Sequence, residues 1–453
     1  MKKNIAIVMC LCLTLFVLTA CSNGSPKETI TNSNGGEHAI DVDGETASYE
    51  NVIVEKSGDS DGDESDFTGT NAAVYAQNGG TLTMTKSEIN TSGKHANAVF
   101  AYGEKSSIEI SDSMISTTEN NSGGIMVTGG GTIKASNLKI KTQGGSSAAI
   151  RSDRGGGTIT VDGGEYSSYG SGSPAIYSTA DITVNDATLH SDISEAVVIE
   201  GKNSVELNNV TATGKNSKQN SDNTDKKKAV MIYQSMSGDA SEGKGKFVMN
   251  GGTLESLEGG MFYVTNTIAD IELKSVELKY ATDDLLSVEK AGWGTEGSNG
   301  GQVNFTATKQ KLEGVVTVDE ISRANIVLED GSNFSGQIKS EGKTFVKIDE
   351  GSTWTLTGDS EISSLNCSAD AIKLNGFTLK VNGKKYKEGT ASKGEEIEFE
   401  APKADAGNGG MPSGDGNGQP PEKPKDGNGQ PPEKPDGENG RPPEPPEGDA
   451  LKQ

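Results

Sequence analysis

The side chains that could support catalysis are few and widely spaced. The chain has only four arginines and three histidines, and His38, His95 and His190 lack the spacing of metal ligands. One short segment, Arg151–Arg154, brings two guanidinium groups and a carboxylate together. A polysaccharide lyase could use such a basic group opposite acidic side chains. We favour an outward-facing, salt-bridged segment instead, so no catalytic residue is assigned.

Carboxylates elsewhere give partial matches to a hydrolase. Asn223-Thr224-Asp225 and Asp283-Asp284 correspond to two of the motifs of polygalacturonase-like enzymes. The Gly-His-Gly and Arg-Ile-Lys motifs of the same pattern are missing from the sequence. We therefore expect a protein without catalytic activity and keep a polysaccharide lyase or hydrolase as the alternative.

An acidic loop near the start of the chain could bind a metal ion. Its carboxylates alternate around Gly62, and Ca²⁺ takes roughly six to eight oxygen ligands. The loop lacks the late glutamate of an EF-hand, and a solvated acidic turn is the alternative. Calcium is the only cofactor suggested, and its candidate ligands are Asp59, Asp61, Asp63 and Asp66.

A third set of residues could bind a ligand without reacting with it. Large side chains, several of them aromatic, follow regularly spaced aliphatic residues, and aromatic rings offer flat surfaces for stacking against sugars. Exposed apolar surfaces on repeat proteins usually contact a partner. The predicted ligand-binding stripe consists of Tyr75, Phe100, Tyr102, Arg151, Tyr177, Tyr233 and Phe262. The alternative is that the N-terminal segment or the insertion at 215–228 covers this face.

The stripe depends on a sequence repeat of about 25 residues. The aliphatic centres Val74, Val99, Ile125, Ile150 and Ile176 are separated by 25, 26, 25 and 26 residues. Two further columns follow each centre, for example Ile108/Ile110 and then Ile115. Pairs spaced by two lie on one side of a strand, and the residues between them are polar.

Three short strands per repeat predict an all-β protein with a right-handed parallel β-helix, because stacked coils bury what one coil cannot. An antiparallel sandwich would not require a fixed period. We place the β-helix at 47–362, a small β cap at 363–400, and a disordered tail rich in proline and glycine at 401–453.

The first residues predict export. Lys2 and Lys3 precede an apolar run that is too short to span a membrane comfortably, as in a signal peptide. Leu18-Thr19-Ala20-Cys21 resembles the lipobox of bacterial lipoproteins, which implies cleavage after residue 20 and lipidation of Cys21. We expect residues 21–46 to form a polar linker. The protein would then be anchored by lipid to the extracytoplasmic face of the cell membrane.

Composition restricts the partners. The formal net charge of −24 would repel nucleic acids, so none is expected as a ligand. Of the four cysteines, only Cys367 would remain unmodified after processing, so an internal disulfide is not expected.

Several motifs together resemble a known family. Asn71-Ala72-Ala73-Val74, Asn97-Ala98-Val99 and Trp354-Thr355-Leu356-Thr357-Gly358 resemble segments of adhesin-like, pectin-lyase-fold β-helical lipoproteins of Gram-positive bacteria. The resemblance covers about 47–365 and implies surface display and carbohydrate binding. Fold similarity is a weak guide to function, so two alternatives remain: an enzyme of this fold, or a structural spacer without a ligand.

Overall fold

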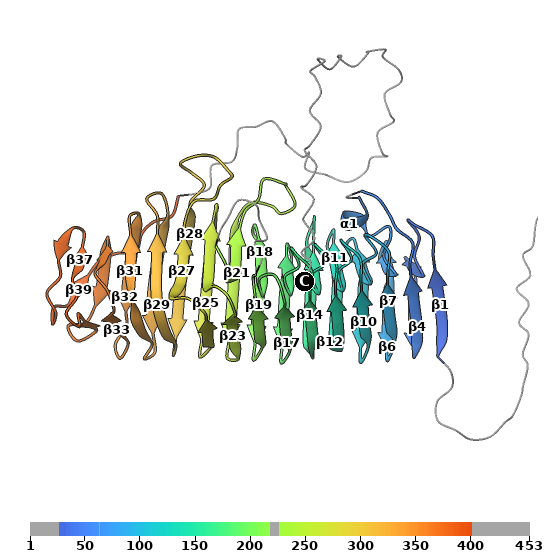
Figure 1. Ribbon diagram of the computed structural model, residues 1–453, viewed down its shortest axis with the longest axis horizontal. Coiled ribbons are helices and arrows are strands. Elements are labelled where there is room, and N and C mark those ends of the chain that lie inside the picture. The colour runs from blue at the N-terminus through green and yellow to red at the C-terminus, as the bar shows by residue number, and fades with distance from the viewer. Residues whose placement is uncertain (1–26, 63, 218–225, 401–453) are drawn as a thin grey trace, which may run out of the picture. The chain divides into compact units, whose positions relative to one another are not determined.

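The computed structural model describes residues 27–62, 64–217 and 226–400. Apart from one short helix, the regular structure of these residues consists of strands, and Figure 1 shows them as a row of stacked arrows running from β1 to β39. Nearly every pairing is parallel and joins a strand to its counterpart one coil away, as in β5 with β8. The predicted all-β class and parallel stacking are confirmed.

The strands form three columns, here called the first, second and third faces. The first face is a 14-stranded sheet. Its strands are β2 (Ile40–Asp43), β5 (Val74–Gln77), β8 (Val99–Tyr102), β11 (Ile125–Thr128), β13 (Ile150–Ser152), β15 (Ile176–Ser178), β18 (Val197–Glu200), β21 (Lys228–Tyr233), β24 (Gly260–Thr265), β27 (Asp284–Val288), β29 (Lys311–Val318), β31 (Asn333–Ser340), β33 (Thr353–Leu356) and β36 (Ile372–Lys373).

The second face follows the first along each coil. Its strands are β3 (Thr46–Glu50), β6 (Thr81–Thr85), β9 (Ser107–Ser111), β12 (Gly131–Thr142), β14 (Gly157–Ser168), β16 (Asp181–Asn185), β19 (Ser204–Asn208), β22 (Lys244–Asn250), β25 (Thr267–Lys274), β28 (Gly301–Thr308), β30 (Arg323–Glu329), β32 (Lys343–Ile348) and β35 (Ser364–Cys367).

The third face is shorter. Its strands are β1 (Glu28–Asn32), β4 (Val52–Lys56), β7 (Glu88–Thr91), β10 (Met114–Thr117), the later halves of β12 and β14, β17 (Thr188–Ser191), β20 (Thr211–Gly214), β23 (Thr253–Ser256) and β26 (Glu277–Tyr280). Because β12 and β14 continue from the second face into the third, these two faces form one sheet, which has 22 strands when β39 (Ser392–Lys393) is included.

Identical alternation in every coil produces the core. In β6, Leu82 and Met84 are fully buried, whereas Thr81, the first residue of the strand, is exposed. Leu82 lies in register with Ile108 of the next coil, and Ile108 with Ile133 of the following one. The apolar side chains therefore form continuous ladders, and each coil completes the burial of its neighbours.

Corners between the second and third faces need a left-handed backbone. Asn137 occupies this conformation with φ of 55°, and Asp186 with φ of 52°. Asparagine and aspartate tolerate it better than other non-glycine residues, and glycine tolerates it best, as at Gly163 with φ of 71°. These corners are therefore formed by asparagine and aspartate as well as by glycine.

The boundaries differ from the prediction at the beginning of the β-helix. Strands β1 and β2 already belong to the stack, since β1 pairs with β4 and β2 pairs with β5. The predicted polar linker over 21–46 is therefore wrong for residues 28–46. The segment was misread because its strands are largely polar and lie at the end of the stack, where few side chains can be buried.

The opposite end changes its cross-section. After β26 the third face stops, and the remaining coils consist of first-face and second-face strands. The coil pattern continues into β35 and β36, past the predicted boundary at 362. The remaining strands are β34 (Ser360–Ile362), β37 (Leu379–Val381), β38 (Lys384–Lys385) and β39 (Ser392–Lys393), and the helix is α1 (Glu64–Thr68).

Candidate functional site

The predicted stripe lies on the outer side of the first face. Tyr75 is in register with Phe100, which is followed by Met126, Arg151 and Tyr177 in successive coils. These side chains form clusters separate from the main core, in agreement with an outward direction. The stripe is nevertheless not an open surface, because Tyr75 is only 3% exposed and Phe100 is fully buried.

One end of the stripe is covered by residues 64–70, here called the α1 strap. The Tyr75 hydroxyl donates a hydrogen bond to the carbonyl oxygen of Thr68. The Thr128 hydroxyl donates to the carbonyl oxygen of Phe67 over 2.6 Å. Phe100 and Met126 are buried beneath this segment with Tyr75, and Tyr102 packs against them. This end of the stripe is therefore covered, but by residues 64–70, a segment that was not predicted to cover it.

The other end is covered by two loops, residues 234–243 between β21 and β22 and residues 289–300 between β27 and β28. Trp293 donates its indole N–H to the carbonyl oxygen of Gln234 over 2.8 Å. Its ring meets Tyr233 edge-on at 6.1 Å between centroids. Val198, Met231 and Tyr263 are buried in the same outer cluster.

Phe262 does not belong to the stripe. It is in register with Val230 and packs inside the core between Phe247 and Phe305, whereas Tyr263 is in register with Met231 and points outward. The alignment of the repeat was wrong by one residue at this coil, and a shift of one residue moves a side chain to the opposite side of a strand.

A cleft of about 300 Å³ remains between the α1 strap and the β21–β22 loop. We call it the Arg151 cleft. Its floor is supplied by β13 and β15 of the first face and its walls by the turns before these strands, the strap and the β21–β22 loop. The lining residues are Asp66, Phe67, Asn121, Ser146, Ala148, Arg151, Asp153, Gly172, Tyr177 and Asp239.

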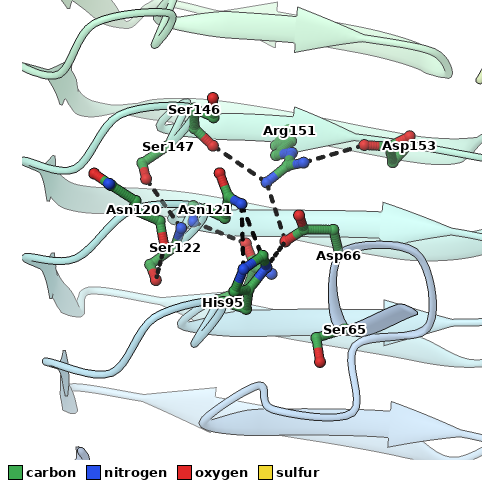
Figure 2. A network of polar contacts seen from close by, with 12 residues as sticks. Ser65, Asp66, His95, Asn120, Asn121, Ser122, Ser146, Ser147, Arg151 and Asp153 are labelled. Carbon is green, nitrogen blue, oxygen red and sulfur yellow. Dashed lines mark hydrogen bonds and ion pairs between the residues drawn. The ribbon is translucent and has the colours of Figure 1, made fainter. Parts of the chain in front are cut away.

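Arg151 is the central group of the cleft and is 8% exposed. Its guanidinium donates to Asp153 Oδ2 over 3.1 Å and to the carbonyl oxygen of Ser146 over 3.3 Å. It also lies 3.8 Å from Asp66 Oδ1, as Figure 2 shows. Burial opposes the positive charge, but Asp66 and Asp153 outweigh this effect and raise the pKa of Arg151.

Asp153 is an unusual carboxyl group. Burial raises its pKa to about 6, Arg151 opposes that shift, and the nearby charge of Asp239 adds to it. The backbone N–H of Arg154 donates to Asp153 Oδ1 over 3.0 Å. Asp153 therefore changes its protonation state near pH 6, within the range in which a group can act as an acid or base.

Asp66 connects the α1 strap to the first face. Its Oδ1 lies 3.1 Å from Nδ1 of His95, in addition to its contact with Arg151. Asn121 in turn places its amide nitrogen 3.4 Å from the His95 ring nitrogens, completing the network in Figure 2. This ionic network fixes the strap over the stripe.

Arg154 joins the two walls of the cleft. Its Nε donates to Asp239 Oδ1 of the β21–β22 loop over 2.7 Å. The same guanidinium lies 3.6 Å from the ring centroid of Phe67 on the strap, a cation–π contact. The Arg151–Arg154 segment is thus salt-bridged and outward-facing, as the favoured interpretation held, and it also lines a cleft.

Tyr177 is held in place by a buried carboxylate. Its hydroxyl donates to Glu200 Oε2 over 2.6 Å, and the Tyr233 hydroxyl donates to the same oxygen over 3.0 Å. Glu200 is 1% exposed. Burial, followed by the neighbouring Tyr233 and Glu200, raises the pKa of Tyr177 well above its ordinary value, so the phenol stays protonated.

The candidate calcium ligands do not converge. Asp59 and Asp61 are exposed, and Asp59 accepts a hydrogen bond from the backbone of Lys94. Asp66 instead contacts the basic groups of His95 and Arg151. Asp63 lies outside the described residues. Within the described ranges, no three histidine, cysteine or acidic side chains form a metal-binding group.

Several residues of the cleft were not anticipated. Asp66 was assigned to calcium, and Phe67, Asp239 and Glu200 were not singled out at all. Their contacts link segments far apart in the sequence, such as Arg154 and Asp239, and no local motif marks them.

Comparisons with known proteins give no family assignment. No protein-family model matches the chain, and no curated protein matches it significantly. Among the described residues, no helix is long and apolar enough to cross a membrane.

Gly69 offers a test of how the strap is held. Its φ is +74°, and an added Cβ would lie 2.6 Å from Tyr75 and 2.8 Å from Phe100. We expect Gly69→Ala to destabilise the strap by about 1–3 kcal/mol through backbone strain and overpacking. Limited proteolysis should then cut residues 64–70 faster.

Gly62→Ala is the matched control, since Gly62 also has a positive φ of +95° but nothing within 4 Å of an added Cβ. It should add only backbone strain. Equal proteolysis of the two variants would contradict the packing of the strap on Tyr75 and Phe100.

The titration of Asp153 gives a second test. We expect its carboxyl to be protonated below about pH 6 and ionised above it. Asp239→Asn removes a negative charge that raises the pKa, so the midpoint should fall. Carbon-13 NMR of labelled aspartate measures both values, and Asp192→Asn, beside His190, is the control. An ordinary midpoint near pH 4 in the unaltered protein would contradict the burial of Asp153.

Proposed function

We propose that this chain is a lipid-anchored surface protein that binds carbohydrate in the Arg151 cleft. The observation that carries this proposal is the composition of the cleft. Two aromatic residues, Phe67 and Tyr177, share its lining with the amide of Asn121, the turn at Ser146 and several carboxylates. Ligand sites combine apolar surface with a few fixed polar groups, and sugars present both apolar ring faces and hydroxyl groups.

The proposed ligand site is the Arg151 cleft and not the open stripe. Tyr75 and Phe100 are covered by the α1 strap and cannot stack on a ligand in this arrangement. By contrast, Tyr177 and Arg151 line the cleft, so part of the original stripe is retained. The covered part of the stripe would favour the remaining alternative, a structural spacer without a ligand.

The supporting architecture is a β-helix displayed outside the cell. We infer a right-handed winding, because parallel strands joined by crossover connections are right-handed in nearly all known cases. We also infer that β37, β38 and β39 cap the stack, since their antiparallel pairings end the parallel ladders. A cap protects a sheet edge from pairing with other chains.

The lipid anchor rests on the sequence alone. Cys21 and the signal peptide lie outside the described residues, and the described chain begins at residue 27, directly before β1. A lipid at Cys21 would therefore hold the first coil close to the membrane, with five residues between the modified cysteine and the described chain. The Pro/Gly-rich tail at 401–453 also lies outside the described residues.

Polysaccharide cleavage is a second candidate function. Its supporting observation is Asp153, whose pKa of about 6 lies in the range of a catalytic acid or base. Asp66 approaches the same guanidinium from the strap, so two carboxyl groups share one cleft. Glycoside hydrolysis commonly uses such a pair, but the tight ion pairing with Arg151 favours binding over catalysis.

Native gels containing plant, bacterial or host polysaccharides test both candidates. Residues 22–453 without lipid should be retarded in at least one polymer, and Phe67→Ala should reduce the retardation by removing an aromatic wall of the cleft. Phe377→Ala, a partly exposed phenylalanine remote in sequence, is the matched control. Shortening of the polymer after incubation would favour cleavage. No retardation by any polymer would contradict the binding function and leave the spacer.

Lipidation has its own test. We expect cells that express the full chain to incorporate labelled fatty acid into it and to retain it in the membrane fraction. Cys21→Ala should abolish the label and release the protein, whereas Cys367→Ala should change neither, since Cys367 is buried in the fold. Unchanged labelling of Cys21→Ala would contradict the anchor.

A further inference from the structure

We infer that the Arg151 cleft selects sugars without carboxylate groups, uncharged sugars or amino sugars, and excludes uronic acids. This inference rests on the proposed carbohydrate-binding function and adds the class of ligand. Its basis is the way in which the charged groups of the cleft are already paired.

The cleft offers a ligand little positive charge. Among the residues that line the described cleft, Arg151 is the only lysine or arginine. Its two terminal nitrogens are directed to Asp153, Asp66 and the carbonyl oxygen of Ser146. An arginine recognises a carboxylate best through two parallel N–H donors. Both terminal nitrogens of Arg151 already face acceptors of the protein.

Arg154 carries the nearest other guanidinium group in the sequence. Its Nε donates to Asp239, and its planar group is stacked on Phe67. Moving Arg154 toward a ligand would release both walls of the cleft. It is therefore a structural cation rather than a free binding group.

Acidic side chains outnumber the arginines in and beside the cleft. Asp66, Asp153 and Asp239 line it; Arg151 is paired with the first two and Arg154 with Asp239. A ligand carboxylate would approach these aspartates without meeting an unpaired arginine, and like charges placed together disfavour binding strongly. Polymers rich in uronic acids are thus the wrong class of ligand at neutral pH.

The polar groups of the cleft suit a ligand that donates hydrogen bonds. Asp66, Asp153 and Asp239 line it with carboxyl groups, and ionised carboxylate oxygens accept hydrogen bonds but donate none. Sugar hydroxyl and ammonium groups are donors, whereas an ionised carboxylate is not.

The experiment uses the polymer that retards the protein in native gels. Its primary hydroxyl groups are oxidised to carboxylates, which leaves the backbone unchanged. We expect the dissociation constant at pH 8 to rise at least about ten-fold, because each carboxylate meets the aspartates of the cleft. Equal or tighter binding of the oxidised polymer would overturn the inference.

The native gels already distinguish a failure of the inferred ligand class from a failure of carbohydrate binding itself. Retardation by a polyuronate such as polygalacturonate, lost in Arg151→Gln, would overturn the exclusion of uronic acids. It would leave the carbohydrate-binding function intact. Retardation by no polymer would remove both. Retardation by an uncharged or amino polymer, weakened by oxidation, supports both.

A variant that gains binding gives a test whose expected result cannot arise from a loss of folding stability. Asp153→Asn removes one of the carboxylates that pair with Arg151, while the amide keeps the shape of the side chain. We expect this variant to bind the oxidised polymer at least about ten-fold more tightly than the unaltered protein does. Asp192→Asn, which removes an aspartate beside His190, should show no gain. Absence of a gain in Asp153→Asn would contradict the role of the paired carboxylates.

Discussion

The register between successive coils is the constraint on which the rest of this structure depends. Each strand donates and accepts backbone hydrogen bonds with its counterpart one coil away, so every residue has a fixed partner above and below. Val99 lies beside Ile125, and Phe100 beside Met126. Inward residues therefore build one core, and outward residues build a surface in which neighbours come from positions about 25 residues apart. The Arg151 cleft exists because this register brings Met126, Arg151 and Tyr177 into one column.

The register alone would give a flat face, and the connecting segments turn it into a cleft. The α1 strap and the β21–β22 loop approach from opposite ends of the stripe, and Arg154 contacts both through Phe67 and Asp239. Between them, Arg151 is surrounded by carboxylates, and burial raises the pKa of Asp153 to about 6. Apolar burial thus covers the aromatic ends of the stripe, whereas its charged centre borders the Arg151 cleft.

Most of the architecture could be predicted from the sequence, because periodic burial leaves a periodic pattern of residues. The three columns and the outward position of Tyr75 through Met231 followed from spacing alone. Phe262 was misplaced because the pattern near Gly260 fits two alignments that differ by one residue. The ends were misjudged because coils there bury fewer apolar residues, as the polar strands β1 and β2 show.

The cleft could be predicted only in part. Arg151, Asp153 and Tyr177 belong to the repeat and were recognised, whereas Asp66, Phe67 and Asp239 lie in loops whose positions no repeat determines. Hydrogen–deuterium exchange with a saturating oligosaccharide of the polymer that binds tests the central claim most directly. The account predicts slower exchange at residues 64–70, 150–154 and 234–239. Protection confined to the second or third face would contradict it.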